Sequence, residues 1–401
     1  MADEPAGGRS GRELGLVVAG TCLIAGTYGL VRLAYGLFLP DISDSLPLGS
    51  ALAGYVSSGA SAAYCAGALV GLLAGDRPRL LVTAALGTAA VGALGMALAP
   101  GLWLFVPAAV LASAGAGFAS PGLVGVVARN IAADRMARAQ AIVNSGTGPG
   151  LVGAGLLALV VSQWRLGFVL GAAFTAVAGL CVLVLDHAGP RRTDPHPTGP
   201  APTGSRWYDG VRRLAGLGRP TAGALLLGAA SATVWTYGRA HLVAAGASDT
   251  ESVVAWIAIG VGGSATVLTA RRLGALPAPR AWMLTTVSAA AATAALFSPG
   301  PLAVAVGACA LFGWGFVAAS SALIVWVGEV APQHAAAGTS AVFIALVVGQ
   351  AVGSTATGSL SGVVGLPGTF ALAAATAVLA SAAGWTQAAW VSRSGPAGRR
   401  R

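Results

Sequence analysis

Long apolar runs separated by short polar connections dominate the chain. The first run, residues 14–40, holds 26 residues before its closing proline, and only Arg32 among them is charged. A transmembrane helix needs about 20 consecutive apolar residues, so this run is long enough to cross a bilayer. The alternation of period two that marks membrane strands is absent, and open sheets do not occur in lipid. The pattern therefore predicts membrane-spanning helices.

Twelve such segments can be counted, and each is long enough to form a spanning helix. We expect them at residues 14–39, 51–74, 80–99, 102–128, 139–161, 166–185, 220–246, 252–270, 281–298, 301–327, 337–361 and 367–391. The expected fold class is an all-α integral membrane protein with twelve transmembrane helices in two six-helix pseudo-symmetric bundles.

Composition agrees with a membrane protein. Apolar residues make up 56% of the 401 positions and charged residues only 9%, whereas soluble domains carry about a quarter charged residues. The net charge of +10 would suggest a nucleic-acid partner in a soluble protein. Here the arginines stand between apolar segments, so we expect the lipid bilayer as the partner and no nucleic acid.

The arginines also predict the topology. If alternate connections are assigned to one side, that side and the two termini hold 20 of the 23 arginines, and the opposite connections hold only Arg165. Arg32 and Arg239 are the two that fall inside spans. By the positive-inside rule, both termini are expected in the cytoplasm, in a multi-pass protein of the inner (cytoplasmic) membrane.

The longest polar stretch divides the helices six and six. It predicts a cytoplasmic tail at 1–13, a first bundle at 14–186, a cytoplasmic linker at 187–219, a second bundle at 220–391 and a basic tail at 392–401. The two halves resemble repeats, because Thr-Tyr-Gly precedes an arginine in the first helix of each, at 27–29 before Arg32 and at 236–238 before Arg239.

Several motifs resemble those of the major facilitator superfamily. Residues 71–79 (GLLAGDRPR) are similar to its loop between helices two and three, although the usual glycine between the basic residues is missing. Residues 146–153 (GTGPGLVG) are similar to the fifth-helix motif associated with antiporters, and residues 164–168 (WRLGF) to the start of helix six. Residues 32–35 (RLAY) followed by Leu39 and Pro40 resemble the YbfB/YjiJ-like branch. The resemblance implies a secondary transporter whose bundles rock about a central site.

Two arginines are the candidate substrate clamp. Tyr28, Arg32 and Tyr35 are spaced for one helix face, and Trp235 and Arg239 repeat the spacing of four in helix seven. Guanidinium forks bind carboxylate or phosphate bidentately, and the organophosphate exchangers of the superfamily also place arginines on helices one and seven. The alternative is that each arginine binds backbone carbonyls or reaches towards the interface. Asn144 and Gln350 are polar candidates for the cavity wall.

Other residues are candidates for movement. The charged residues after helices two and four are candidates for an inner gate. Alternatively, they belong to solvated loops that only set the topology. These residues are Asp76, Arg77, Arg79, Asp134 and Arg138. For a hinge between the halves we consider the glycines and proline of helix five, whose alternative role is close packing; they are Gly146, Gly148, Pro149, Gly150 and Gly153.

Enzymatic chemistry is not indicated. No nucleotide loop, no metal-ligand spacing and no nucleophile beside a base can be found, so neither a catalytic residue, a metal nor a cofactor is expected. The leading hypothesis is transport of a small anionic or polar organic solute by a monomer, with the coupling ion open and a proton possible. The alternatives are efflux of drug-like or secondary-metabolite compounds and, in another class, a non-transporting sensor or membrane partner.

Overall fold

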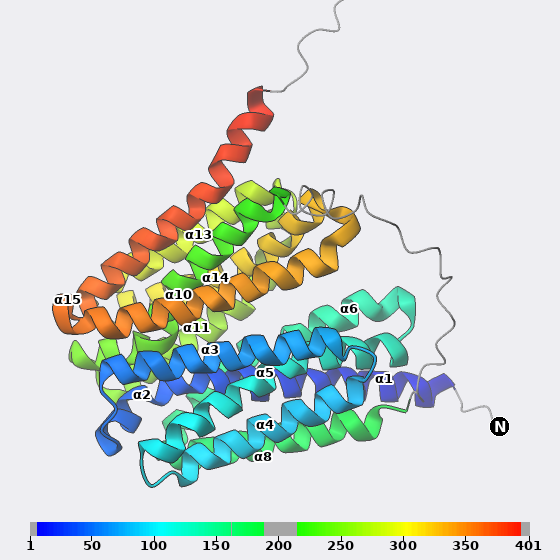
Figure 1. Ribbon diagram of the computed structural model, residues 1–401, viewed down its shortest axis with the longest axis horizontal. Helices are drawn as coiled ribbons and strands as arrows, with labels where there is room; N and C mark the ends of the chain where they lie inside the picture. Colours follow the sequence, from blue (N-terminus) through cyan, green and yellow to red (C-terminus); the bar gives the residue numbers. More distant parts are fainter. Residues whose placement is uncertain (1–5, 162, 188–214, 394–401) are drawn as a thin grey trace, which may run out of the picture.

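The computed structural model describes residues 6–161, 163–187 and 215–393 (Figure 1), and this part of the chain is built from helices and their connections. The all-α fold predicted from the apolar runs is confirmed. The predicted linker at 187–219 lies outside the described residues except at its two ends, as do most of the tail at 392–401 and residues 1–5 of the first tail.

The first half contains eight α-helices and one π-helix among the described residues. They are α1 (Ala6–Ile24), η1 (Ala25–Leu33), α2 (Ala34–Ser45), α3 (Ser50–Leu73), α4 (Pro78–Leu98), α5 (Leu102–Asn130), α6 (Ala133–Asn144), α7 (Thr147–Val160) and α8 (Trp164–Leu185).

The second half begins with the short turn η2 (Ala215–Leu217). It continues with α10 (Gly218–Ala244), α11 (Asp249–Ser264), α12 (Thr266–Gly274), α13 (Ala278–Ala295), α14 (Leu302–Val330), the turn η3 (Pro332–His334) and α15 (Ala335–Arg393).

Several predicted spans consist of more than one element. The first is α1, η1 and α2 in succession, the fifth is α6 followed by α7, and the eighth is α11 followed by α12. Within α15, Gly365 has φ 71° and ψ 166°, a left-handed conformation that favours glycine, and this residue separates the eleventh span from the twelfth.

Among the described residues, eight stretches are long and apolar enough to cross a membrane, including Gly11–Ser45 and Gly338–Trp385, the latter of which holds two spans. The other expected spans are α3, α10 and α13, with 24, 27 and 18 residues. At 1.5 Å per residue, even the shortest is about 27 Å long, close to the hydrocarbon thickness of a bilayer. The structure thus agrees with the twelve-span prediction.

The two halves form two layers, with α1 to α8 in one and α10 to α15 in the other (Figure 1). They meet where α3 lies along α15, α7 along α11, and α2 along α10. The connections at 74–77, 131–132 and 275–277 lie at one end, which we call the Arg-rich end. The connections at 46–49, 99–101, 245–248 and 296–301 lie at the other, which we call the opposite end.

Candidate functional site

Arg32 lies in the π-helix η1, between the two layers. Its Nε donates to Ser113 Oγ of α5 at 3.1 Å, and its Nη2 donates to Gln350 Oε1 of α15 at 3.1 Å. The centre of the guanidinium stands 4.8 Å from the centroid of the Tyr64 ring of α3, a distance at which a cation is attracted to the ring face. Three helices from both halves therefore fix this one cation.

A chain of hydroxyl groups continues from Arg32. The hydroxyls of Tyr28 and Tyr64 are 3.0 Å apart, and that of Tyr28 is also 3.0 Å from Ser120 Oγ. The two tyrosine rings meet edge to face, with centroids 5.9 Å apart. Tyr28 thus holds the ring beneath Arg32. Tyr64, Ser113 and Ser120 were not among the residues selected from the sequence, because serine and tyrosine in membrane helices carry no local signal.

A pocket opens beside Arg32, with about 570 Å³ of space unfilled by atoms, part of it open to solvent. Seventeen residues line it; they are Val31, Arg32, Leu33, Tyr35, Gly36, Val56, Ser57, Ala60, Ser61, Met96, Ala109, Ala112, Ser113, Ala232, Trp235, Thr236 and Gln350. Four residues chosen from the sequence meet here, namely Arg32, Tyr35, Trp235 and Gln350. Tyr28 lies outside the lining and acts through its hydrogen bond to Tyr64. Asn144 is an exposed residue that also lies outside the lining.

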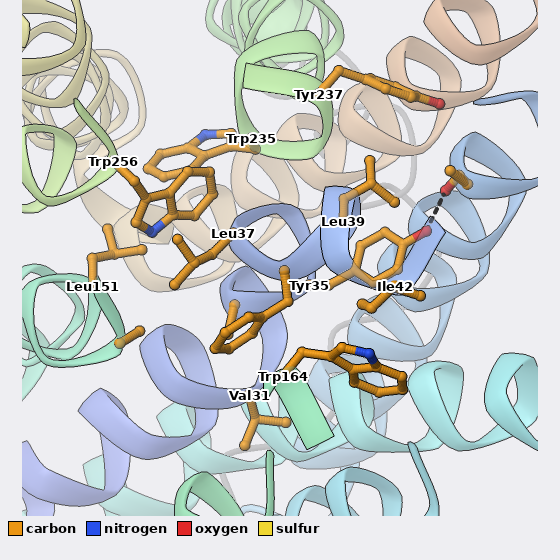
Figure 2. Close-up of a cluster of buried hydrophobic side chains, with 14 of the residues drawn as sticks. Val31, Tyr35, Leu37, Leu39, Ile42, Leu151, Trp164, Trp235, Tyr237 and Trp256 are labelled. Atoms are coloured by element: carbon orange, nitrogen blue, oxygen red, sulfur yellow. Dashed lines mark hydrogen bonds between the residues drawn. The ribbon is translucent and has the colours of Figure 1, made fainter. Parts of the chain in front are cut away.

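The apolar floor of this region is a packed core (Figure 2). Tyr35 donates its hydroxyl proton to the carbonyl of Ala53 at 3.0 Å. Trp235 lies against Trp256, with ring centroids 6.2 Å apart, and Leu37 lies beside the pair. The indole N–H groups of both tryptophans are buried and have no hydrogen-bond partner among the described residues. Trp235 is 7% exposed.

Arg239 occupies a different position. Its side chain is only 3% exposed and forms ion pairs with Asp41 of α2 and Asp249 of α11, the latter at 3.2 Å. It also donates to the Leu37 carbonyl at 2.7 Å and to Ser252 Oγ at 3.1 Å. The residues that line the pocket do not include Arg239. The structure therefore does not bring the two arginines into one clamp; Arg239 joins the halves at the opposite end.

The candidate gate residues lie at the Arg-rich end. Asp76 and Arg77 are paired at 3.8 Å with side chains 76% and 70% exposed, and Asp134 is 4.0 Å from Arg135. Arg138 is exposed. Arg79 lies 3.6 Å from Asp186, a carboxylate that is fully buried after α8.

Asp186 is the centre of a cluster of polar contacts at the Arg-rich end. This residue was not among those selected from the sequence. It forms an ion pair with Arg129, accepts from Asn130 Nδ2 at 2.7 Å, and its backbone carbonyl accepts from Arg79 at 2.8 Å. The sequence does contain a signal for this cluster, because Asp186 directly follows an apolar span and Arg79 and Arg129 lie at the ends of two other spans on the same side. The cluster ties α4, α5 and α8 within the first half.

The candidate hinge lies where α6 ends and α7 begins, around Ser145 and Gly146. A Cβ on Gly150 would come within 2.5 Å of the Ala25 carbonyl oxygen, so only glycine permits α7 to approach helix one this closely. A Cβ on Gly148 would meet Gly260 and Ser264 of α11 in the other half. Pro149 is exposed, and nothing lies within 4 Å of the position of a Cβ on Gly153. The segment packs against both halves.

Further hydrogen bonds join the halves between Arg32 and the opposite end. Ser57 and Thr236 are 2.9 Å apart, and Ser58 donates to the Ala351 carbonyl at 2.5 Å. At the start of α3, the Ser50 carbonyl accepts from the Tyr237 hydroxyl at 2.8 Å. Together with Arg239, these contacts hold the layers closed at the opposite end. Among the described residues, no cluster of three metal-ligating side chains occurs.

These features define a polytopic helical membrane protein with two layered halves and, between them, a mostly apolar pocket that holds Arg32. A family model described as "Major Facilitator Superfamily" matches residues 21–354, more than four fifths of the chain. The chain belongs to this superfamily, whose members carry solutes across membranes, and it is not expected to be an enzyme.

Solved structures share the fold at low identity. One is a bacterial homologue of the human lysosomal transporter Spinster, with 16% identity, coverage of 97% of both chains and a TM-score of 0.69. The nucleoside transporter NupG has 15% identity over 94% of this chain and 98% of its own, with a TM-score of 0.71. A POT family transporter bound to a thioalcohol-conjugated peptide has 12% identity over 94% and 96%, with a TM-score of 0.72. No curated protein sequence matches.

Proposed function

We propose that the protein is a secondary active transporter that moves a small anionic or polar organic solute across the cytoplasmic membrane by alternating access, with Arg32 as the anion-binding group. One observation carries the proposal. Arg32 lines the pocket and has no carboxylate partner among the described residues, whereas Arg239 has two. Its Nη1 also has no hydrogen-bond partner there, so this nitrogen is available to a solute.

The physical argument rests on the energy of an unpaired charge in the membrane. An arginine inside a span costs roughly 3 kcal/mol on insertion scales, and it cannot lose its proton to escape that cost. Asp41 and Asp249 offset this cost for Arg239. For Arg32, neutral partners and the Tyr64 ring offset part of it, and a bound anion would complete the neutralisation.

The bundles at 14–186 and 220–391 are proposed to move as two units about this pocket. With the Arg-rich end in the cytoplasm, as the distribution of arginines favours, the layers are closed on the outer side. Cysteines at Ser50 and Gly204 should then be labelled by an impermeant reagent from opposite sides of the membrane. Labelling of both from the same side would exclude this topology.

Two alternatives have support of their own. Efflux of drug-like compounds is favoured by the glycine-rich segment at 146–153 and by the mostly apolar lining of the pocket. Membership of the YbfB/YjiJ-like branch is supported by residues 32–35 and by Leu39 and Pro40. A non-transporting sensor is distinguished from all of these by a time course of solute accumulation in vesicles.

The test is a thermal-shift screen of the purified protein against organic anions and cationic drugs, since a ligand that binds the folded state raises its stability. Arg32→Ala should abolish the shift given by an anion while the protein stays folded. Arg32→Lys should bind poorly, because an ammonium lacks the two-pronged donor geometry. A cationic ligand that stabilises the Arg32→Ala protein as well as the wild type would refute the anion proposal and favour drug efflux.

A further inference from the structure

The charges around the pocket restrict the kind of solute that fits, given the function proposed above. Arg32 is the only charged residue among the seventeen that line the pocket. The ammonium of a zwitterion would therefore find no carboxylate there. The acids paired in the described spans lie elsewhere, with Asp41 and Asp249 on Arg239 and Asp186 on Arg79 and Arg129. A second anionic group would likewise enter without an oppositely charged partner, and a buried charge without one is strongly disfavoured.

The orientation of Arg32 is fixed before any solute arrives. Ser113 occupies Nε, Gln350 accepts from Nη2, and the Tyr64 ring lies against the guanidinium. A guanidinium carries five N–H donors, so both hydrogens of Nη1 and one of Nη2 are left over. One hydrogen of Nη1 and one of Nη2 form the end of the fork, where the two oxygens of a single carboxylate can be bound side by side when Gln350 takes the other hydrogen of Nη2.

α10 contributes one aromatic side chain to the pocket lining, Trp235, and neighbouring rings hold it in place. Trp235 packs against Phe312 and Phe316, with ring centroids 5.4 Å away in each case and rings steeply inclined, and against Trp256 at 6.2 Å. Trp256, Phe312 and Phe316 lie outside the lining, so the aromatic surface of the pocket comes from Trp235 and Tyr35. Most of the remaining lining is aliphatic, contributed by α3, α4, α5 and η1. Such walls bind a flat apolar body and offer few partners to a strongly polar one.

We infer that the solute is an organic anion with a single negative charge and an apolar, ring-sized body, for which an aromatic monocarboxylate is the fitting chemistry. The carboxylate binds the end of the Arg32 fork and the ring lies against Trp235. Dianions and zwitterions carry a second charge that has no oppositely charged partner in the pocket, and short aliphatic acids have no ring to lie against Trp235.

Equilibrium dialysis of the purified full-length protein against five probes tests this inference. Benzoate has the ring and one charge, acetate lacks the ring, phthalate carries a second charge, phenylalanine is a zwitterion, and benzylamine reverses the charge. Benzoate should bind at least about tenfold more tightly than each of the other four, because each loses either the ring contact or the charge match.

Matched variants test separately the ring contact at Trp235 and the charge contact at Arg32. Trp235→Leu should weaken benzoate binding about three- to tenfold, while Trp103→Leu, at a residue 74% exposed, should not. Arg32→Gln should abolish binding, while Arg165→Gln, whose guanidinium binds the carbonyls of Ala97 and Ala99, should leave it unchanged.

The outcomes separate the two proposals. Equal binding of acetate and benzoate, with both lost in Arg32→Gln, would overturn the aromatic inference and leave the anion transporter standing. Absence of benzoate binding, or binding that Trp235→Leu does not weaken, would also overturn the inference. Preference for benzylamine, or benzoate binding that survives Arg32→Gln, would overturn both.

Discussion

Replacing Arg239 by glutamine should open the protein at the opposite end. Two contacts of Arg239 cross between the halves, to the Leu37 carbonyl at 2.7 Å and to the Asp41 carboxylate, and these must break when the layers separate. The contacts to Asp249 and Ser252 lie within the second half and survive the movement. Arg239 therefore stabilises the closed arrangement through the first pair of its contacts only.

The size of the effect follows from those two contacts. Hydrogen bonds that involve a charged group contribute roughly 1.5–3 kcal/mol each. Asp41 is 29% exposed, which places its share at the lower end of that range. Their loss should thus favour the open arrangement by about 3–4.5 kcal/mol, a shift of roughly 160- to 2,000-fold in the equilibrium between closed and open.

The assay is double electron–electron resonance between spin labels at Ser43 and Ser298, exposed residues at the opposite end of the two halves. The labels are placed in protein whose four own cysteines have been replaced. Arg239→Gln should add a longer distance, and Asp41→Asn should do so to a smaller extent. Arg165→Gln is the control, because its contacts stay within the first half. An unchanged distance distribution in Arg239→Gln would refute the reasoning.

Two further predictions concern the Arg-rich end. Asp186→Asn should lower the temperature of the thermal unfolding transition measured in detergent. The change leaves Arg129, whose side chain is 11% exposed, without its carboxylate partner, and breaking a buried pair costs about 3–5 kcal/mol. A transition temperature equal to that of the wild type would contradict the structural role of the cluster. Asp76→Asn should leave that transition unchanged, because Asp76 and Arg77 are both largely exposed, and a large loss of stability would show that Asp76 has a partner in another conformation.

Sequence reasoning predicted the helices well because length and hydropathy determine them. The expected spans at 102–128 and 166–185 correspond to α5 (Leu102–Asn130) and α8 (Trp164–Leu185), with differences of a few residues at the ends. A run of apolar residues long enough to cross lipid has no other stable structure there, so its position along the chain is sufficient. The break at Gly365 was also anticipated by the gap between the last two expected spans.

The site was harder to predict because its parts come from distant positions. Arg32 was found because a charge within an apolar run is conspicuous, but its partners Ser113 and Gln350 are 81 and 318 residues away. The equivalence of Arg32 and Arg239 suggested by the repeat is not seen in their surroundings. Asp41 and Asp249 lie at span ends, where a carboxylate is unremarkable, and only the packing of α2, α10 and α11 brings them to Arg239.

The lone charge of Arg32 has an electrical consequence. Moving one elementary charge across the full membrane field is worth about 2.3 kcal/mol per 100 mV, and a residue inside the span crosses part of it. If the protein reorients about Arg32 as proposed, a bound monovalent anion makes the central pocket neutral, and the loaded reorientation carries no net charge of the pocket across the field. Without the anion, the same movement carries the positive charge of Arg32. A voltage step should therefore displace charge in the empty protein and much less in the loaded one, so the membrane potential acts on the return step and not on the delivery of the solute.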